Sequence, residues 1–101
     1  MTFYILCKTN EVEEEGLKQF VLKETEILVI KHMGQIYCFQ ARCTHAGAPL
    51  VEGELMDNVL QCPWHGSRFD IKNGLVIRGP AEKQLHMFNS KIEEEQLLID
   101  L

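Results

Sequence analysis

The sequence predicts one small, mostly β domain, residues 1–101, in which an antiparallel β framework of the sandwich or barrel type carries a loop-rich insert. Three observations lead to this fold class. Short segments rich in β-branched and aromatic residues alternate with turn signals along most of the chain. A length of 101 residues is typical of a single domain. The interval 41–80 holds most of the glycines and all the prolines, so we expect the framework at about 1–40 and 81–101.

Four strands are predicted ahead of the insert. Segment 3–7 is the first. Segments 16–23 and 27–32 follow and are joined by a tight turn, and Gly34 marks the turn into segment 35–40. The acidic run 11–15 is expected to be a loop or one helical turn that forms a solvated surface, as most charge runs do.

Five further strands are predicted in the insert and after it: 58–62, 67–71, 75–78, 85–92 and 96–101. The first of these follows a turn at Asp57–Asn58. Asn73–Gly74 is a strong hairpin signal because both residues tolerate positive φ angles. The last two segments are expected to form a hairpin that closes the framework.

The charge balance narrows the class of partner. Ten basic residues and fifteen acidic residues give a net charge of −5. This balance argues against nucleic acid as a partner, because phosphates demand a basic face. It is typical of a protein whose partner carries a basic patch.

Targeting signals are not apparent. No apolar run approaches the roughly 20 residues that cross a bilayer. The apolar start, Met1 to Cys7, lacks the basic region and the cleavage site of a signal peptide. We therefore expect a soluble cytoplasmic protein that does not insert into a membrane, and we interpret clustered cysteines as metal ligands rather than as disulfides.

Two segments of the insert carry the chemistry. They read C-T-H-A-G-A-P-L, residues 43–50, and C-P-W-H-G-S-R-F-D, residues 62–70. Each offers one thiolate and one imidazole, and the four candidate ligands are Cys43, His45, Cys62 and His65. Thiolates and imidazoles together suit zinc, copper or iron–sulfur chemistry.

Ligand spacing bears on the choice of metal. Structural zinc sites usually pair like ligands, as in C-x₂₋₄-C with H-x₃₋₅-H. Here each segment mixes the two ligand types, and one segment has a single intervening residue. Two neighbouring loops can instead present both cysteines to one iron and both histidines to another. Zinc stays an alternative, and a zinc protein would be colourless.

The two segments resemble the signature of Rieske-type [2Fe–2S] ferredoxins. The likeness extends to 12–16, 27–39 and Gly79–Pro80, and it covers nearly the whole chain. It implies one [2Fe–2S] cluster with two cysteines on one iron and two histidines on the other, bound by the four candidate ligands. It also implies a small cluster-binding subdomain on a larger β base, with surface histidines and a third, proline-containing loop at 79–83.

The family resemblance implies a one-electron carrier and not an enzyme. Both irons are fully ligated, so that no open site remains for a substrate. Because the chain ends at Leu101 without a second domain, we expect a free-standing monomeric carrier that serves an oxygenase, a reductase or a similar redox enzyme. The alternatives are a small subunit of a larger enzyme, such as a nitrite-reductase-type complex, and a zinc-stabilised binding module.

The Rieske proteins of respiratory and photosynthetic membrane complexes resemble this chain in their ligands but have high reduction potentials. They have one further cysteine in each ligand loop, and the two form a disulfide; the matching positions here are Ala48 and Trp64. They place a tyrosine hydroxyl near a cysteine ligand, where this chain has Phe69. Ser67 matches a serine that can donate a hydrogen bond to cluster sulfur. The resemblance therefore implies a potential in the lower half of the roughly −150 to +300 mV Rieske range.

Overall fold

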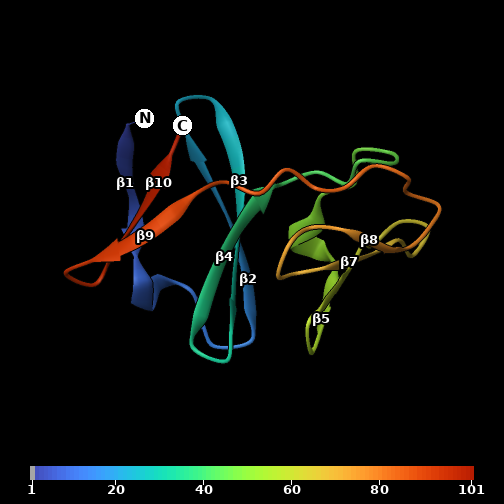
Figure 1. Ribbon diagram of the computed structural model, residues 1–101, viewed down its shortest axis with the longest axis horizontal. Helices are drawn as coiled ribbons and strands as arrows, with labels where there is room; N and C mark the ends of the chain where they lie inside the picture. Colours follow the sequence, from blue (N-terminus) through green and yellow to red (C-terminus); the bar gives the residue numbers. More distant parts are fainter. Residues whose placement is uncertain (1) are drawn as a thin grey trace.

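The computed structural model describes residues 2–101 as three antiparallel sheets that follow one another along the long axis (Figure 1). The first sheet consists of β1 (Phe3–Lys8), β10 (Gln96–Asp100) and β9 (Ser90–Glu93), in that order. The second consists of β2 (Gly16–Leu22), β3 (Thr25–His32) and β4 (Gln35–Gln40). The third consists of β5 (Glu54–Met56), β6 (Val59–Gln61), β7 (Arg68–Asp70) and β8 (Val76–Arg78).

The middle sheet is covered on both faces. Ile27, Leu28, Val29 and Ile30 of β3 are all fully buried. Because successive side chains of a strand point to opposite faces, Ile27 and Val29 pack toward the first sheet, whereas Leu28 and Ile30 pack toward the third. A continuous apolar run is what such a two-sided burial requires.

Two hydrophobic cores therefore lie on either side of the middle sheet. The core toward the first sheet contains Cys7, Val12, Ile27, Val29, Cys38, Leu97 and Ile99. The core toward the third sheet contains Leu28, Ile30, Phe39, Ala41, Cys43, Ala48, Leu50, Leu60, Cys62, Phe69, Ile71, Ala81 and Leu85. The larger core thus includes both cysteines of the candidate metal site.

The chain returns from the third sheet to the first across β4. The amide of Gln40 donates to the carbonyl of His86, and the amide of Phe88 donates to the carbonyl of Cys38, each at 2.9 Å. The predicted strand 85–92 is wrong in its first half, since the regular strand covers only Ser90–Glu93. A segment that leaves one sheet and joins another cannot keep a single hydrogen-bond ladder.

Three smaller differences from the sequence prediction concern short elements. The strand β5 was not predicted, because its three residues offer no alternation to read. Two 3₁₀ turns, Thr9–Glu11 and Leu50–Glu52, complete the secondary structure. The helical turn near the acidic run thus ends where the run begins.

Within residues 2–101, no helix is long and apolar enough to cross a membrane.

The acidic run is more than a solvated surface, because two of its carboxylates bind the turn between β3 and β4. Met33 and Gly34 adopt positive φ angles of 49° and 76° in that turn. Both oxygens of Glu14 accept the amide of Gly34, at 2.7 and 3.0 Å. Glu15 accepts the amide of Met33 at 3.0 Å and lies 2.6 Å from Nδ1 of the buried His32.

These contacts predict an acid-sensitive contribution to stability. The Met33 amide, and next the His32 ring, hold the pKa of Glu15 below its ordinary value of 4.5. A lowered folded-state pKa stabilises the fold above the unfolded pKa, and this stability is lost as the pH falls through the folded pKa. We expect Glu15→Gln to lower the thermal midpoint at pH 7 and to flatten its decline between about pH 5 and pH 3.

Thermal unfolding followed by circular dichroism across that pH range measures the effect. Glu13→Gln is the matched control, because Glu13 is an exposed residue of the same run. Parallel pH profiles for the wild type and Glu15→Gln would contradict the role given to Glu15.

Candidate metal centre

Two loops carry the four predicted ligands, and the structure brings these residues together in two pairs. Cys43 and His45 lie on the loop that leaves β4, whereas Cys62 and His65 lie on the loop between β6 and β7. Both cysteines are buried, and both histidines are exposed. The two imidazole rings lie 5.2 Å apart between centroids, at an interplanar angle of 59°. The arrangement therefore sorts the donors into a buried sulfur pair and an exposed nitrogen pair.

The first ligand loop is closed by its own backbone. The amide of Cys43 donates to the carbonyl of Ala48 at 2.9 Å, and the amide of Gly47 donates to the carbonyl of Cys43 at 3.0 Å. Gly47 has a φ angle of +73°, which glycine adopts at little cost. His45 consequently lies at the tip of a tight turn that projects it to the surface.

The second ligand loop closes in a parallel way. The amide of Cys62 donates to the carbonyl of Ser67 at 2.8 Å, so that in both loops the cysteine amide bonds the fifth residue onward. His65 has a φ angle of +62° and Gly66 one of +75°. Histidine is among the residues that tolerate this left-handed region better than most. The turn lets His65 leave the buried side of the loop within three residues of Cys62.

Burial controls the protonation of the Cys62 thiol. Removal from water, and to a lesser degree the neighbouring Cys43 thiol, raise the pKa of Cys62 to about 11, although the Trp64 amide lowers it. Metal binding to a thiolate releases a proton, so a cation bound by Cys62 has to displace its proton. The positive charge of the metal then offsets the cost of burying the thiolate.

The donor set fits a two-iron cluster. Within residues 2–101, no three His, Cys, Asp or Glu side chains gather around a single point. The four candidate residues instead form one pair of thiols and one pair of imidazoles. A [2Fe–2S] centre with two cysteines on one iron and two histidines on the other requires such a division.

A third loop joins the two ligand loops. The hydroxyl of Ser67, fully buried, accepts the amide of Ala81 at 2.9 Å. The hydroxyl of Thr44 donates to the carbonyl of Lys83. A serine that accepts one hydrogen bond keeps its own proton for a second partner. The predicted loop 79–83 is therefore fixed against both ligand loops, and the Ser67 proton is available inside the site.

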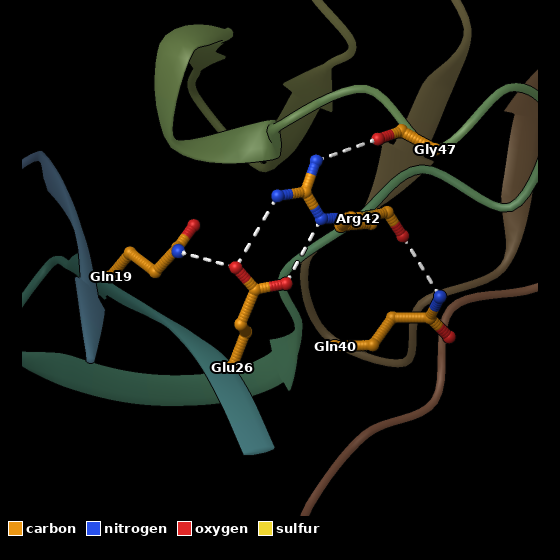
Figure 2. Close-up of polar contacts among 5 residues, drawn as sticks. All are labelled: Gln19, Glu26, Gln40, Arg42 and Gly47. Carbon is orange, nitrogen blue, oxygen red and sulfur yellow. Dashed lines mark hydrogen bonds and ion pairs between the residues drawn. The ribbon is translucent and has the colours of Figure 1, made fainter. Parts of the chain in front are cut away.

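A polar network ties the first ligand loop to the middle sheet (Figure 2). The guanidinium of Arg42 donates to both carboxylate oxygens of Glu26 on β3, at 2.9 and 3.3 Å, and to the carbonyl of Gly47 at 3.1 Å. Gln19 of β2 also donates to Glu26 at 3.2 Å. On the other side, Gln40 donates to the carbonyl of Arg42 at 2.8 Å.

Sequence reasoning missed this network. Arg42 and Glu26 lie far apart in the chain and belong to no shared motif. They meet because β3 and β4 pair antiparallel, with Ile27 opposite Gln40. The contact thus follows from the register of the hairpin, which a single sequence does not reveal.

Comparison with known proteins places the chain among iron–sulfur proteins. The profile of the Rieske [2Fe-2S] domain matches residues 2–89. Apoptosis-inducing factor 3 of Mus musculus is 34% identical over 94 residues, which is 93% of this chain but only 16% of that protein. The ferredoxin component of the naphthalene 1,2-dioxygenase system of Pseudomonas putida is 32% identical over 92 residues, which covers 91% of this chain and 88% of that one.

Solved structures show the same fold. The ferredoxin of Sphingomonas yanoikuyae B1 superposes with a TM-score of 0.93 over 99% of both chains, at 24% identity. The ferredoxin of carbazole 1,9a-dioxygenase from Nocardioides aromaticivorans IC177 gives a TM-score of 0.91 over 98% of this chain and 97% of that one, at 20% identity. At such identities the likeness concerns the fold alone.

The Arg42 network predicts a local effect on the first ligand loop. We expect Arg42→Gln to speed hydrogen exchange of the amides in 43–48 by up to about fivefold, the equivalent of about 1 kcal/mol for an exposed pair. Hydrogen exchange followed by mass spectrometry measures it. Glu26→Gln should reproduce the effect.

The matched control is Glu93→Gln, which breaks the exposed pair of Lys91 and Glu93 in the first sheet. That change should leave exchange in 43–48 unaltered. Equal protection of these amides in the wild type and Arg42→Gln would show that the network does not hold the loop.

Proposed function

Because the chain belongs to the Rieske [2Fe–2S] domain family, we propose that it is a one-electron carrier that delivers electrons to an oxygenase, a reductase or a similar redox enzyme. The match to ferredoxin components over nearly the full length of both chains carries this proposal. When bound, the cluster supplies one-electron redox chemistry. The chain itself holds the ligands, excludes water from the sulfur side and leaves the histidine side accessible.

We assign the thiolates of Cys43 and Cys62 to one iron and the imidazoles of His45 and His65 to the other. The pairing of like donors supports this assignment. Burial of the cysteines keeps water from the sulfur side, whereas the exposed histidines would hold the other iron at the surface that a partner can reach. The carrier is not itself an enzyme in this proposal.

The proposal includes the organisation of the chain and its location. We take 1–40 and 81–101 as the base and 41–80 as the cluster-binding part of a single domain. A monomer in the cytoplasm fits the two free thiols of Cys7 and Cys38, since a reducing compartment preserves thiols. Burial raises the pKa of both thiols to about 11, which keeps them protonated and unreactive.

A second candidate is a Rieske part of a larger redox enzyme. Apoptosis-inducing factor 3 favours it, because this chain matches only 16% of that protein. The nitrite-reductase-type subunit is another case of the same kind. Gel filtration of native extract separates the two proposals: a carrier elutes near 11.6 kDa, whereas a subunit elutes with its complex.

The metal content tests the ligand assignment. Protein purified without oxygen should be red-brown and should hold two irons and two acid-labile sulfides per chain. Cys62→Ala and His65→Ala should abolish the cluster and lower stability, because metal-binding free energy is also folding free energy. Iron and sulfide assays with visible absorption provide the measurement.

The matched control is His86→Ala, which removes an exposed histidine that makes an edge-to-face contact with Phe88 and lies outside the two ligand loops. This variant should keep its cluster. Stoichiometric zinc without iron in the anaerobic wild-type protein would refute the iron–sulfur assignment.

The buried Ser67 hydroxyl predicts an effect on the reduction potential. A hydrogen bond to cluster sulfur stabilises the added negative charge of the reduced state, so its loss lowers the potential. Hydrogen bonds to charged groups are worth about 1.5 to 3 kcal/mol, or roughly 60 to 130 mV for one electron. We expect Ser67→Ala to lower the potential by at most this amount, as measured by protein-film voltammetry.

Phe69→Tyr is the opposite change. Phe69 is fully buried in the core that contains both cysteine ligands, and a hydroxyl there adds a donor. We expect its potential to rise and the wild-type value to lie in the lower half of the roughly −150 to +300 mV Rieske range. No response to either change would mean that backbone donors and burial set the potential.

A further inference from the structure

The net negative charge of the protein is confined to one part of the chain. Residues 41–80 hold four basic and four acidic residues and are neutral overall, whereas the rest of the chain holds six basic and eleven acidic residues. The third sheet lies within the neutral part. An acidic partner is therefore repelled by the rest of the chain, whereas residues 41–80 carry no net charge to repel it.

Two arginines of the third sheet lie directly opposite each other. Arg68 of β7 lies opposite Arg78 of β8, beside a β-bulge that shifts the register between Arg68 and Phe69. Like charges in this position destabilise a sheet, so that the pair needs a compensating contact. In residues 2–101, neither guanidinium forms an ion pair.

The nearby carboxylates are engaged elsewhere or lie further along the sheet. Asp70 accepts the amide of Lys72 at 2.9 Å and so closes the turn after β7. Glu54 of β5 lies opposite Gln61 of β6, which places a strand between Glu54 and Arg68. The compensating charge for the arginine pair does not come from these two residues.

The Arg68 side chain is held in a fixed direction. Its Nε donates to the side-chain oxygen of Gln61 at 2.9 Å. This contact uses one of five guanidinium donors, and the terminal nitrogens keep theirs. A planar guanidinium that is already oriented suits the two-point binding of a carboxylate.

The arginine pair lies at the end of the third sheet where the histidine loop enters β7 and the loop 79–83 leaves β8. β7 begins at Arg68, directly after the loop of His65, and β8 ends at Arg78, directly before the loop 79–83. Because the two strands are antiparallel, both arginines lie at the same end of the sheet as the histidine loop. Trp64, 48% exposed, and Ile77, 55% exposed, add apolar surface to this region.

We propose that Arg68 and Arg78 form a docking site for carboxylates on the surface of the redox partner. The inference rests on the proposed function, because it concerns the partner of an electron carrier. Arginine and tryptophan are enriched at the centres of protein interfaces. The negative charge of the chain outside residues 41–80 repels an acidic surface. An acidic partner therefore approaches with its carboxylates toward the arginines and the histidines.

The net charge of the protein and the local charge beside the histidine loop favour different partners. A net charge of −5 predicts a basic partner. The positive charge of the two arginines beside the histidine loop instead predicts that the partner has an acidic contact surface. Docking depends on the charge within about one Debye length of the contact, which is roughly 10 Å at 0.1 M salt. The arginine pair, rather than the net charge, therefore determines the charge of the partner surface that binds there.

Two inorganic electron acceptors of opposite charge test the local potential. Reduced protein passes one electron to ferricyanide, an anion, giving ferrocyanide, or to tris(phenanthroline)cobalt(III), a cation, giving the cobalt(II) complex; no proton is transferred in either case. At low ionic strength, we expect the double variant Arg68→Gln/Arg78→Gln to react about threefold or more slowly with ferricyanide and faster with the cobalt complex. Stopped-flow absorption measures both rates.

Rate changes of opposite sign with the two acceptors distinguish an effect of surface charge from an effect of the reduction potential. A variant with a changed reduction potential reacts faster, or slower, with both acceptors. Lys72→Gln is the matched control for each single variant, Arg68→Gln and Arg78→Gln, because each of the three removes one positive charge. Lys72 lies in the β7–β8 turn, at the end of the third sheet away from the histidine loop. Rates that change in the same direction, or that change equally in Lys72→Gln, would overturn the proposal.

A hexaglutamate peptide tests the carboxylate specificity and models an acidic protein surface. It should slow the ferricyanide reaction of the wild type and of Lys72→Gln but not that of the double variant. Isothermal titration should show binding that the double variant loses. If the double variant reacts more slowly than the wild type with ferricyanide but the wild type does not bind hexaglutamate, the arginines form a site for small anions only. That result would overturn the docking role.

Failure of the proposed function looks different. If the chain is no electron carrier, the wild type has no reducible chromophore and reacts with neither acceptor. If the docking site alone is wrong, the wild type reacts with both acceptors and the arginine variants react at the same rates.

Discussion

The burial of β3 on both faces is the constraint on which the rest of the structure depends. Ile27 and Val29 contact one core while Leu28 and Ile30 contact the other, so one strand supports two layers. The ligand loops rest on the larger core, which contains Cys43 and Cys62 themselves. Any shift of β3 would therefore move the sulfur pair. Side-chain packing in such a core leaves little room for adjustment, since protein interiors are close-packed.

The position of the donors follows from this packing. A cysteine can enter a core as a small apolar residue, whereas a histidine that binds a metal through one nitrogen keeps the other for a polar partner. Both loops begin with the buried cysteine and turn outward within three residues to the exposed histidine. The backbone bonds from Cys43 to Ala48 and from Cys62 to Ser67 make these turns self-contained. One side of the site is thereby dry and the other accessible, without any long loop to order.

The sequence predicted most of the fold, and its failures have identifiable causes. The β-branched runs gave β1 to β4, and Asn73–Gly74 marked the β7–β8 hairpin. The pattern failed at 85–89, where the chain passes from one sheet to another, and at β5, which is too short to alternate. The ligand candidates came from two local motifs, and the structure pairs Cys43 with Cys62 and His45 with His65. The contacts of Glu15 with His32 and of Arg42 with Glu26 depend on strand register, which a single sequence does not reveal.

Recognition and redox chemistry are separated in this small domain. The groups that surround the metal site from inside, such as Ser67 and Phe69, are fully buried and constrained by packing. The charges that meet a partner lie on the outer face of the third sheet and at its loops, where substitution disturbs no core. Surface substitutions away from such features usually change stability little. The same buried site can thus serve partners of different surface charge, because residues such as Arg78 can change while the ligand loops stay fixed by their own backbone.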